Sequence, residues 1–403
     1  MSTSYVRFLM VLALSLLIYE VKVLLLNRLN GSIAILHFGI LALFYMYLID
    51  AVSSYVKIAY LAAMVAFSLL CCSVQLSVSK SKAIFLWGLG CWLLLGAFAV
   101  VSKLSFDKIY FLFLELSLLS ASYFIINNAS YLAVLMRAYW LLLVALVIAC
   151  VADYFGYFNF NGAFFGGASE NYTTSLFLGL AFLVFCLRFK WLGRLDVHLI
   201  VPVAFVSLYF NSRFSAAISI LAIVSYLLIF AYQKFRMVVR FFSIYVGMMF
   251  VFAAASVYLL ILTPEINLSI ISSDPRLVIW SEFFNNVKFD EYVYGVDFSL
   301  CCPLINERFA NNPHNSLLRS FSVFGLAGGV YFLMFFIGVI AFFVRPKTRV
   351  YSLAFVFWAT RGMTDSIATP YYFDIFYFSL YILIFSGEKS DKDSRPQGGY
   401  AFT

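Results

Sequence analysis

Charged residues are scarce in this chain, because Asp, Glu, Lys and Arg together make up 11% of its 403 residues. An ordinary soluble domain carries about 25% charged residues, so this chain cannot cover a water-facing surface. Hydrophobic residues instead make up 64% of the sequence, and the mean hydropathy is +0.97. The composition therefore indicates an integral membrane protein whose main solvent is lipid.

The sequence also lacks the common motifs of cofactor chemistry. It has no Walker loop, no GxGxxG that opens a helix, no HExxH and no GxSxG. The seven cysteines show no metal-ligand spacing, so we expect no metal and no other cofactor. Cys301 and Cys302 are neighbours in a loop, but adjacent cysteines rarely bond to each other, and no disulfide is predicted.

The net charge of +8 is spread over short clusters between apolar runs rather than over a basic patch with stacking aromatics. We therefore expect no nucleic-acid partner. Clusters of this kind are typical of cytoplasmic loops between membrane spans.

A membrane span needs about 20 mostly apolar residues. We predict an all-α fold, a polytopic transmembrane helical bundle of about 12 to 13 helices. We expect residues 1–386 to form a single integral membrane domain that includes the periplasmic loop 264–316, and the polar segment 387–403 to be a disordered cytoplasmic tail. The expected spans are 5–26, 31–49, 55–78, 83–101, 109–126, 131–151, 173–188, 195–210, 214–231, 241–263, 317–343, 349–364 and 371–386.

Basic residues in three tight turns predict the orientation. These turns hold Arg188, Lys190 and Arg194, then Lys234, Arg236 and Arg240, then Arg345, Lys347 and Arg349. By the positive-inside rule they are cytoplasmic, which places residues 152–172, 211–213, 264–316 and 361–370 on the opposite, periplasmic face. The orientation of the N-terminal half stays open, because lysines mark two successive turns there.

The segment 264–316 is the largest of these outward segments, and we expect a periplasmic loop that contains short helices. Asp274 can cap a helix and Pro275 suits its first position. The following apolar residues predict a helix face that lies along the membrane interface; they are Leu277, Ile279, Trp280, Phe283 and Phe284.

Arginines on the predicted outer face point to an anion site. Arg213, Arg276 and Arg361 offer permanent planar cations that match phosphate oxygens. His314 is the candidate general acid or base near neutral pH. Supporting polar residues follow from the same placement; they are Asn315, Arg319, Asn171, Trp280 and Asp365.

Each of these residues also has a plain structural interpretation. His314 could cap a helix, Arg213 and Arg361 could anchor helices at the interface, and Trp280 could be an interface anchor. Asn171 could be an ordinary turn residue. Gly325, Gly328 and Gly329 are assigned to close helix packing, without a chemical role.

Four motifs of this chain, together with their order along it, resemble motifs of the O-antigen polymerase (Wzy) and O-antigen ligase superfamily. "PHNSLLRSFSVFGLAGG" resembles its signature of His-Asn, nine residues and Gly-x-x-Gly, which runs here from His314 to Gly328. "NSRFSAAISI" resembles its Ser-Arg motif, and "DPRLVIW" before Gly295 resembles its Arg-x-x-x-Trp segment. "GGASENYTTSLFL" is similar to the Ser-x-Asn stretch of the polymerases.

The resemblance implies a metal-independent glycosyltransferase of the bacterial inner membrane, with its active site facing the periplasm. Such enzymes use undecaprenyl-pyrophosphate-linked oligosaccharides to make lipopolysaccharide or capsule polysaccharide, and a chain-length regulator protein is a possible partner beside the membrane lipids. By this resemblance Arg213 and Arg276 would hold the donor pyrophosphate, and His314 would orient or deprotonate the acceptor hydroxyl. Arg361 and Asp365 are additions from our own reasoning on the residues.

Two alternatives stay open. A ligase would transfer the glycan to lipid A–core rather than to another repeat unit, but the "ASENY" stretch and the aromatic terminal region favour the polymerase. A polysaccharide flippase would need polar residues near the bilayer midplane and usually repeated halves. Here the polar residues gather at one interface and the halves look unlike, which argues against a transporter.

Overall fold

The computed structural model describes residues 82–101, 106–156, 170–232, 275–309, 313–364 and 373–386, as well as the isolated helical positions 62 and 66. The predicted spans 5–26, 31–49, 55–78 and 241–263 lie outside the residues that can be described as elements. The basic turn at 234–240 and the tail 387–403 also lie outside them. Within the described ranges every regular element is a helix, so the all-α class is confirmed there.

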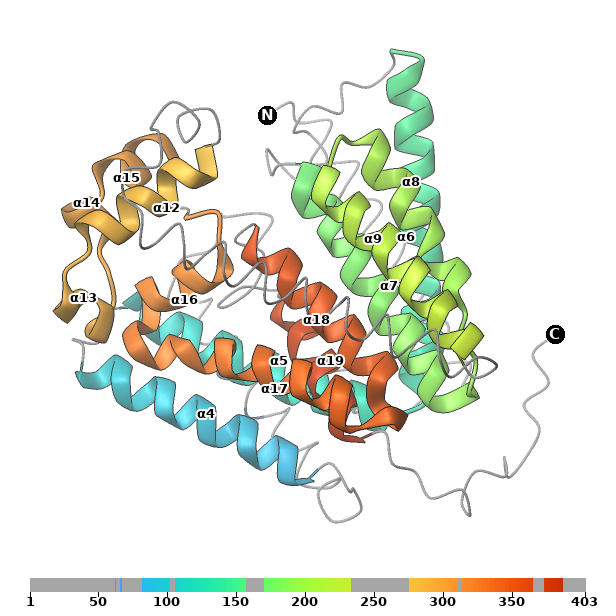
Figure 1. Cartoon of the computed structure of the whole chain (residues 1–403), viewed down its shortest axis with the longest axis horizontal. Coiled ribbons are helices and arrows are strands. Elements are labelled where there is room, and N and C mark those ends of the chain that lie inside the picture. The colour runs from blue at the N-terminus through green and yellow to red at the C-terminus, as the bar shows by residue number, and fades with distance from the viewer. Residues whose placement is uncertain are drawn as a thin grey trace.

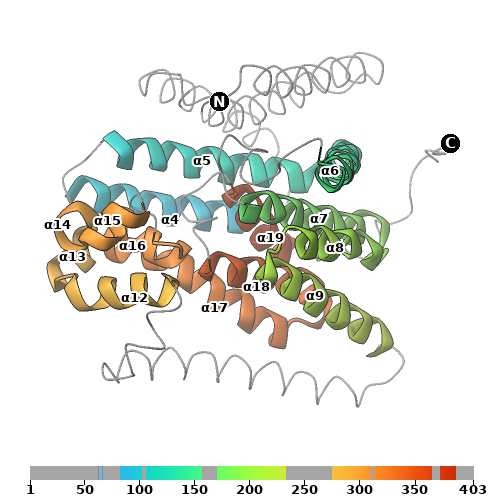
Figure 2. The same cartoon turned by 90° about the horizontal axis from the view of Figure 1, so that it is seen from above.

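The described residues form the following helices, in chain order. Their bounds are α4 Lys82–Val101, α5 Phe106–Asn127, α6 Ser130–Tyr154, α7 Glu170–Leu192, η1 Val197–Leu199, α8 Val201–Tyr209, α9 Arg213–Tyr232, α12 Pro275–Asn286, α13 Phe289–Tyr294, α14 Phe298–Cys301, α15 Pro303–Phe309, α16 Ser316–Phe324, η2 Gly325–Gly328, α17 Gly329–Val344, η3 Pro346–Thr348, α18 Arg349–Met363 and α19 Asp374–Ser386. Figure 2 shows them in layers, with α5 and α6 on one side, α4, α19, α7 and α8 in the middle, and α17, α18 and α9 on the other.

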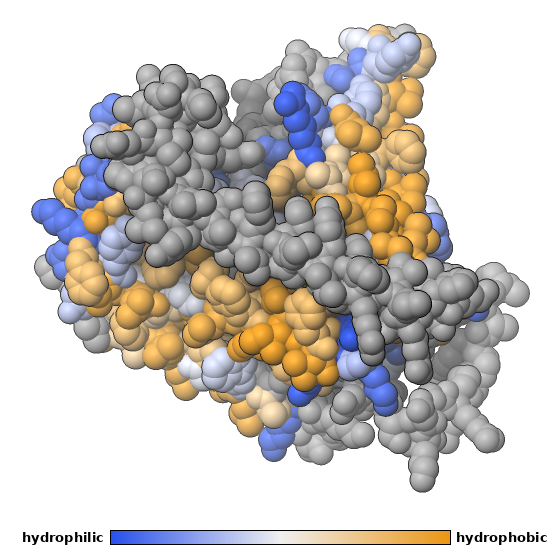
Figure 3. Space-filling model, viewed as in Figure 1, coloured by the Kyte–Doolittle hydropathy of each residue, from blue (hydrophilic) through white to orange (hydrophobic). Residues whose placement is uncertain are grey.

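Four helical stretches of the described part are long and apolar enough to cross a membrane, namely Lys108–Asn127, Tyr131–Tyr154, Thr173–Leu192 and Ser316–Val344. Shorter apolar helices run beside them at Phe85–Val100, Val197–Tyr209, Arg213–Ile229 and Asp374–Ser386. Figure 3 shows apolar residues over much of the coloured surface of one face, with hydrophilic residues between them and at the edges. A surface of this kind suits lipid better than water, which agrees with the composition.

The predicted span 317–343 is not one continuous helix. α16 ends at Phe324, η2 follows over Gly325–Gly328, and α17 begins at Gly329. Gly325 has a φ of +57°, and a Cβ atom there would lie 2.1 Å from the carbonyl oxygen of Val293. A Cβ at Gly328 would lie 2.4 Å from the carbonyl oxygen of Ser320. Gly325 and Gly328 therefore permit close packing, as predicted, whereas a Cβ at Gly329 would meet only ordinary contacts with Phe321, at 3.6 Å. The positive φ of Gly325 ends α16.

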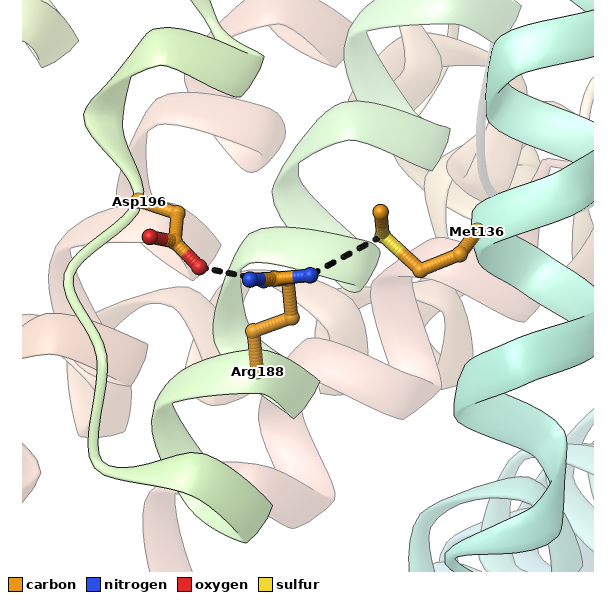
Figure 4. A network of polar contacts seen from close by, with 3 residues as sticks. All are labelled: Met136, Arg188 and Asp196. Carbon is orange, nitrogen blue, oxygen red and sulfur yellow. Dashed lines mark hydrogen bonds and ion pairs between the residues drawn. The ribbon is translucent and has the colours of Figure 1, made fainter. Parts of the chain in front are cut away.

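Two of the three basic turns lie at one end of the bundle, which we call the basic end. The Lys190 ammonium donates to the Ser386 hydroxyl at 3.4 Å, and the Arg345 guanidinium lies 5.3 Å from the ring centre of Phe385. The turn after α7 is held by an ion pair of Arg188 with Asp196, and Arg188 also contacts the Met136 sulfur at 3.9 Å (Figure 4). The two described basic turns therefore lie together at the C-terminal end of α19, whereas the third turn, 234–240, lies outside the described residues.

The segment 275–309 folds into α12 to α15, which Figure 1 shows on one side of the molecule, across from α6 to α9. Its small core contains Ile279 and Phe283 from α12, packed with Leu318 from α16. The prediction that these two residues lie on the membrane interface is therefore wrong, because they face α13 to α16 instead. Pro275 does begin α12 as predicted, whereas the side chain of Leu277 lies outside the described part of the structure.

Hydrogen bonds hold this segment together and join it to α5. The Glu282 carboxylate accepts hydrogen bonds from the backbone amides of Leu304 and Ile305, both at 2.9 Å, at the start of α15. The Lys108 ammonium of α5 donates to the Tyr294 carbonyl at 3.2 Å. Cys301 and Cys302 form a disulfide with each other, contrary to our expectation. The tight turn between α14 and α15 brings the two adjacent side chains together.

Gly325→Ala tests whether this left-handed glycine is required. Any side chain at a positive φ costs about 1–2 kcal/mol, and the short approach to Val293 adds to this cost. We expect a lower unfolding midpoint for the purified protein in detergent. Gly90→Ala on α4 is the matched control, because nothing lies within 4 Å of its added Cβ. A Gly325→Ala protein as stable as Gly90→Ala would contradict the assignment.

Candidate functional site

A buried polar network joins three helices at the end opposite the basic turns, where α7 and α9 begin and α18 ends. We call this end the site end. Arg361 of α18 is 1% exposed, and its Nε donates to the Ser215 hydroxyl of α9 at 2.9 Å. Its terminal nitrogens donate to the Thr364 hydroxyl at 3.2 Å and to the Asn171 carbonyl at 3.5 Å. The guanidinium is thus held between α7, α9 and its own helix end.

Asn171 is bound from the other side by hydroxyl groups. The Ser212 hydroxyl donates to Asn171 Oδ1 at 2.9 Å, and Thr174 donates to Ser212, also at 2.9 Å. The Ser212 and Ser215 hydroxyl oxygens lie 3.1 Å apart, within hydrogen-bonding distance, which connects the network to the Arg361 partner. Buried hydroxyls satisfied in this way fix the side chains around them. Asn171 and Arg361, predicted separately from distant parts of the chain, therefore belong to one network.

The His314–Asn315 turn lies against the end of α18. Asn315 is the N-cap of α16, and its Oδ1 accepts from the amides of Leu317 and Leu318 at 2.8 and 3.1 Å. Its Nδ2 donates to the carbonyl of Met363 at 2.8 Å, two residues beyond Arg361. The His-Asn motif and the arginine network are thus connected through the last turn of α18.

His314 adopts a backbone conformation that is rare for a residue with a side chain. Its φ is +46°, directly before the N-cap. Non-glycine residues in this region are uncommon and recur at functional sites, where the surrounding structure holds them. The fixed Asn315 cap supplies that constraint here, and the His314 side chain is half-buried.

A pocket lies directly beside this turn, between α16, α17, α18 and α19. It is lined by Ser316, Leu317, Tyr331, Phe332, Phe335, Ala359, Gly362, Met363 and Tyr377. Most of its wall is aromatic or aliphatic, while Ser316, Tyr331 and Tyr377 add hydroxyl groups. Because Ser316 follows Asn315 and Met363 accepts the Asn315 hydrogen bond, the pocket adjoins the His-Asn motif.

Other predicted residues lie apart from this network. Arg213 is exposed at the start of α9, and its Nε donates to Asn211 Oδ1 at 3.3 Å. The Arg319 guanidinium lies 5.6 Å from the ring centre of Phe111 on α5. Trp280 packs against the small core of α12 to α15. The side chain of Arg276 and all of Asp365 lie outside the described part of the structure.

The predicted outer segments do meet at one end in their described parts. Asn171, Ser212, Asn315 and Arg361 come from the four segments 152–172, 211–213, 264–316 and 361–370, and hydrogen bonds link them. The structure therefore supports the predicted grouping of these segments, which was derived from the alternation of spans. It adds Ser215 and Thr174, which sequence reasoning missed because single hydroxyl residues are common in apolar helices.

Comparison with known proteins gives no relative: no family model matches this chain, and neither a curated protein nor a solved structure matches it. The site is consequently described from its own geometry. That geometry combines a buried guanidinium, a strained histidine turn and an adjoining apolar pocket at one end of a helical bundle.

Substitutions of Asn315 test the connection between the two motifs. Asn315→Ala removes the cap, which is worth about 1 kcal/mol, and also the hydrogen bond to Met363. Asn315→Asp keeps the cap acceptor but cannot donate to the Met363 carbonyl. We expect stability in thermal unfolding to fall in the order wild type, Asn315→Asp, Asn315→Ala. An unchanged midpoint for Asn315→Ala would show that the turn is held by other contacts.

Proposed function

We propose that this protein is a metal-independent glycosyltransferase, an O-antigen polymerase that joins undecaprenyl-pyrophosphate-linked repeat units at the periplasmic face of the bacterial inner membrane. The observation that carries the proposal is the connection of the His-Asn turn with the buried Arg361 network. Asn171, Asn315 and Arg361 come from separate parts of the sequence. Arg361 donates to the Asn171 carbonyl, and Asn315 donates to the Met363 carbonyl at the end of the helix that carries Arg361.

The proposed reaction needs a stabilised leaving group and an activated acceptor. The acceptor sugar hydroxyl attacks the anomeric carbon of the donor, the bond from that carbon to the lipid pyrophosphate breaks, and the hydroxyl proton leaves with a base. A preorganised guanidinium such as Arg361 stabilises the negative charge that develops on the pyrophosphate. A lipid pyrophosphate needs no nucleotide activation, which agrees with the absence of nucleotide motifs in the sequence.

His314 is the proposed residue for the acceptor. An imidazole group in general gains and loses a proton near neutral pH, so a histidine can accept the proton of the acceptor hydroxyl. His314 lies two residues before Ser316, which lines the pocket, so an acceptor bound in the pocket would lie close to the turn. Arg213 lies near the same end and is exposed, so we assign it to the first capture of the anionic head group rather than to charge stabilisation within the network.

The product of the reaction tests the proposal in cells. Deleting the gene should leave lipopolysaccharide core capped by a single repeat unit, because polymerisation is lost while transfer to core continues. Bare core with polymer retained on its lipid carrier would instead identify a ligase. A normal polymer ladder in the deletion strain would contradict both assignments. The measurement is a gel of the lipopolysaccharide of the host.

Arg361→Lys tests the proposed role of the guanidinium. Lysine keeps the charge but loses the planar fork that reaches several partners. We expect polymer formation by the purified protein to fall on the order of 10²-fold, as when one preorganised donor to a developing charge is removed. Arg349→Lys, at the basic end, is the matched control because Arg349 donates to the Phe342 carbonyl far from the site end.

His314→Ala tests the acceptor side. We expect membrane levels like those of the wild type and polymer formation at background, measured with the same lipid-linked repeat unit. His314→Asn serves as a second variant because asparagine tolerates a positive φ better than alanine, which separates backbone strain from chemistry. Full activity in His314→Asn would remove His314 from the reaction and leave it a structural turn residue.

A further inference from the structure

Two acidic side chains are buried together inside the helical bundle. Glu115 of α5 is 1% exposed, and Asp374, the first residue of α19, is fully buried. α5 packs along α19, and the Ser122 hydroxyl donates to the Ile375 carbonyl at 3.0 Å. The Glu115 carboxyl group lies next to that of Asp374. Sequence reasoning did not single out either residue.

Tyr331 of α17 completes this cluster. Its hydroxyl faces the Glu115 carboxyl group, and it is buried. No hydrogen bond of standard geometry from the described residues reaches the Tyr331 hydroxyl or either carboxyl oxygen of Glu115. The contact between the tyrosine oxygen and the two carboxyl oxygens is therefore loose. An unsatisfied buried tyrosine aimed at a carboxyl pair is a second observation, independent of the acids themselves, that points to a bound species.

The cluster adjoins the pocket beside the His-Asn turn. Tyr331 and Tyr377 both line that pocket, and their rings lie 5.8 Å apart in an edge-on arrangement. The Tyr377 hydroxyl donates to the Tyr331 carbonyl at 2.6 Å, which fixes the two relative to each other. Tyr331 therefore has the pocket on one side and Glu115 on the other.

The groups that face Glu115 from the packed helices supply no positive charge. They are Asp374 and Tyr377 from α19 and Tyr331 from α17, and α4 contributes no titratable group that acts on it. The nearest arginine on α16, Arg319, lies over Phe111, one turn earlier on α5, and is not among the groups that act on Glu115. The described surroundings of Glu115 are therefore acidic, phenolic or apolar.

Two adjacent carboxyl groups in such surroundings cannot both be ionised, because burial and mutual repulsion each disfavour the charged form. A charge within a membrane span is costly unless a partner neutralises it. A proton is the ligand that removes the repulsion without requiring a cavity. We propose that Glu115 and Asp374 form a proton-binding site, with one proton held between the two carboxyl groups and the Tyr331 hydroxyl separating them from the pocket.

This proposal does not depend on the glycosyltransferase assignment, because it concerns the protein without substrate. Infrared spectroscopy of the full-length protein in lipid nanodiscs tests it directly. At neutral pH we expect a carboxylic acid C=O band that shifts in D₂O. The band should be lost in the double variant Glu115→Gln/Asp374→Asn, and it should shift in Tyr331→Phe because the hydroxyl beside Glu115 is gone.

Ser379→Ala is the matched control, because Ser379 is a buried polar residue on the same helix as Asp374 whose hydroxyl has no hydrogen-bond partner among the described residues. Its band should match that of the wild type. A wild-type protein without a protonated carboxyl band at neutral pH would overturn the proposal, and so would a band that persists in the double variant. Circular dichroism of each variant establishes that the helices are retained, so that loss of the band is not loss of fold.

Discussion

A buried arginine in an apolar helical bundle is the constraint on which the rest of the site depends. Burying a charged side chain is costly unless hydrogen bonds to acceptors replace the lost water. Arg361 meets this cost with hydroxyl and carbonyl acceptors on α7, α9 and α18. The requirement to satisfy one guanidinium therefore determines how these helix ends meet, and it draws Asn171 and Ser212 toward the same point.

The His-Asn turn extends the same constraint to α16. The Asn315 side-chain oxygen accepts the capping hydrogen bond, and its side-chain nitrogen donates to the Met363 carbonyl. The turn therefore cannot move without disturbing the end of α18. The glycines of η2 then let α16 and α17 fold back tightly, because Gly325 and Gly328 approach backbone oxygens that any Cβ would meet. The pocket between α16 and α19 results from this packing, and on its far side it reaches the Glu115–Asp374 pair through Tyr331.

The sequence predicts the helices of this protein well but the site only in part. Apolar runs of sufficient length locate α4 to α9 and α16 to α19 within a few residues, because lipid exposure requires such runs. The helix break at Gly325 was not predicted, because a continuous apolar run gives no sign of where the backbone turns. Arg361, Asn171 and Asn315 could be grouped from the alternation of spans, whereas their connection through Met363 depends on helix packing. Glu115 was missed because a single acid inside a long apolar helix has no pattern around it; only the packing of α5 on α19 brings it to Asp374.

The measurement that tests the central claim most directly is a structure of the protein with undecaprenyl pyrophosphate bound in a lipid nanodisc. Our account predicts phosphate oxygens within hydrogen-bonding distance of the Arg361 guanidinium, with the His314 side chain facing the same head group. A head group bound at the basic end, or one held at the site end without contact to either residue, would contradict it.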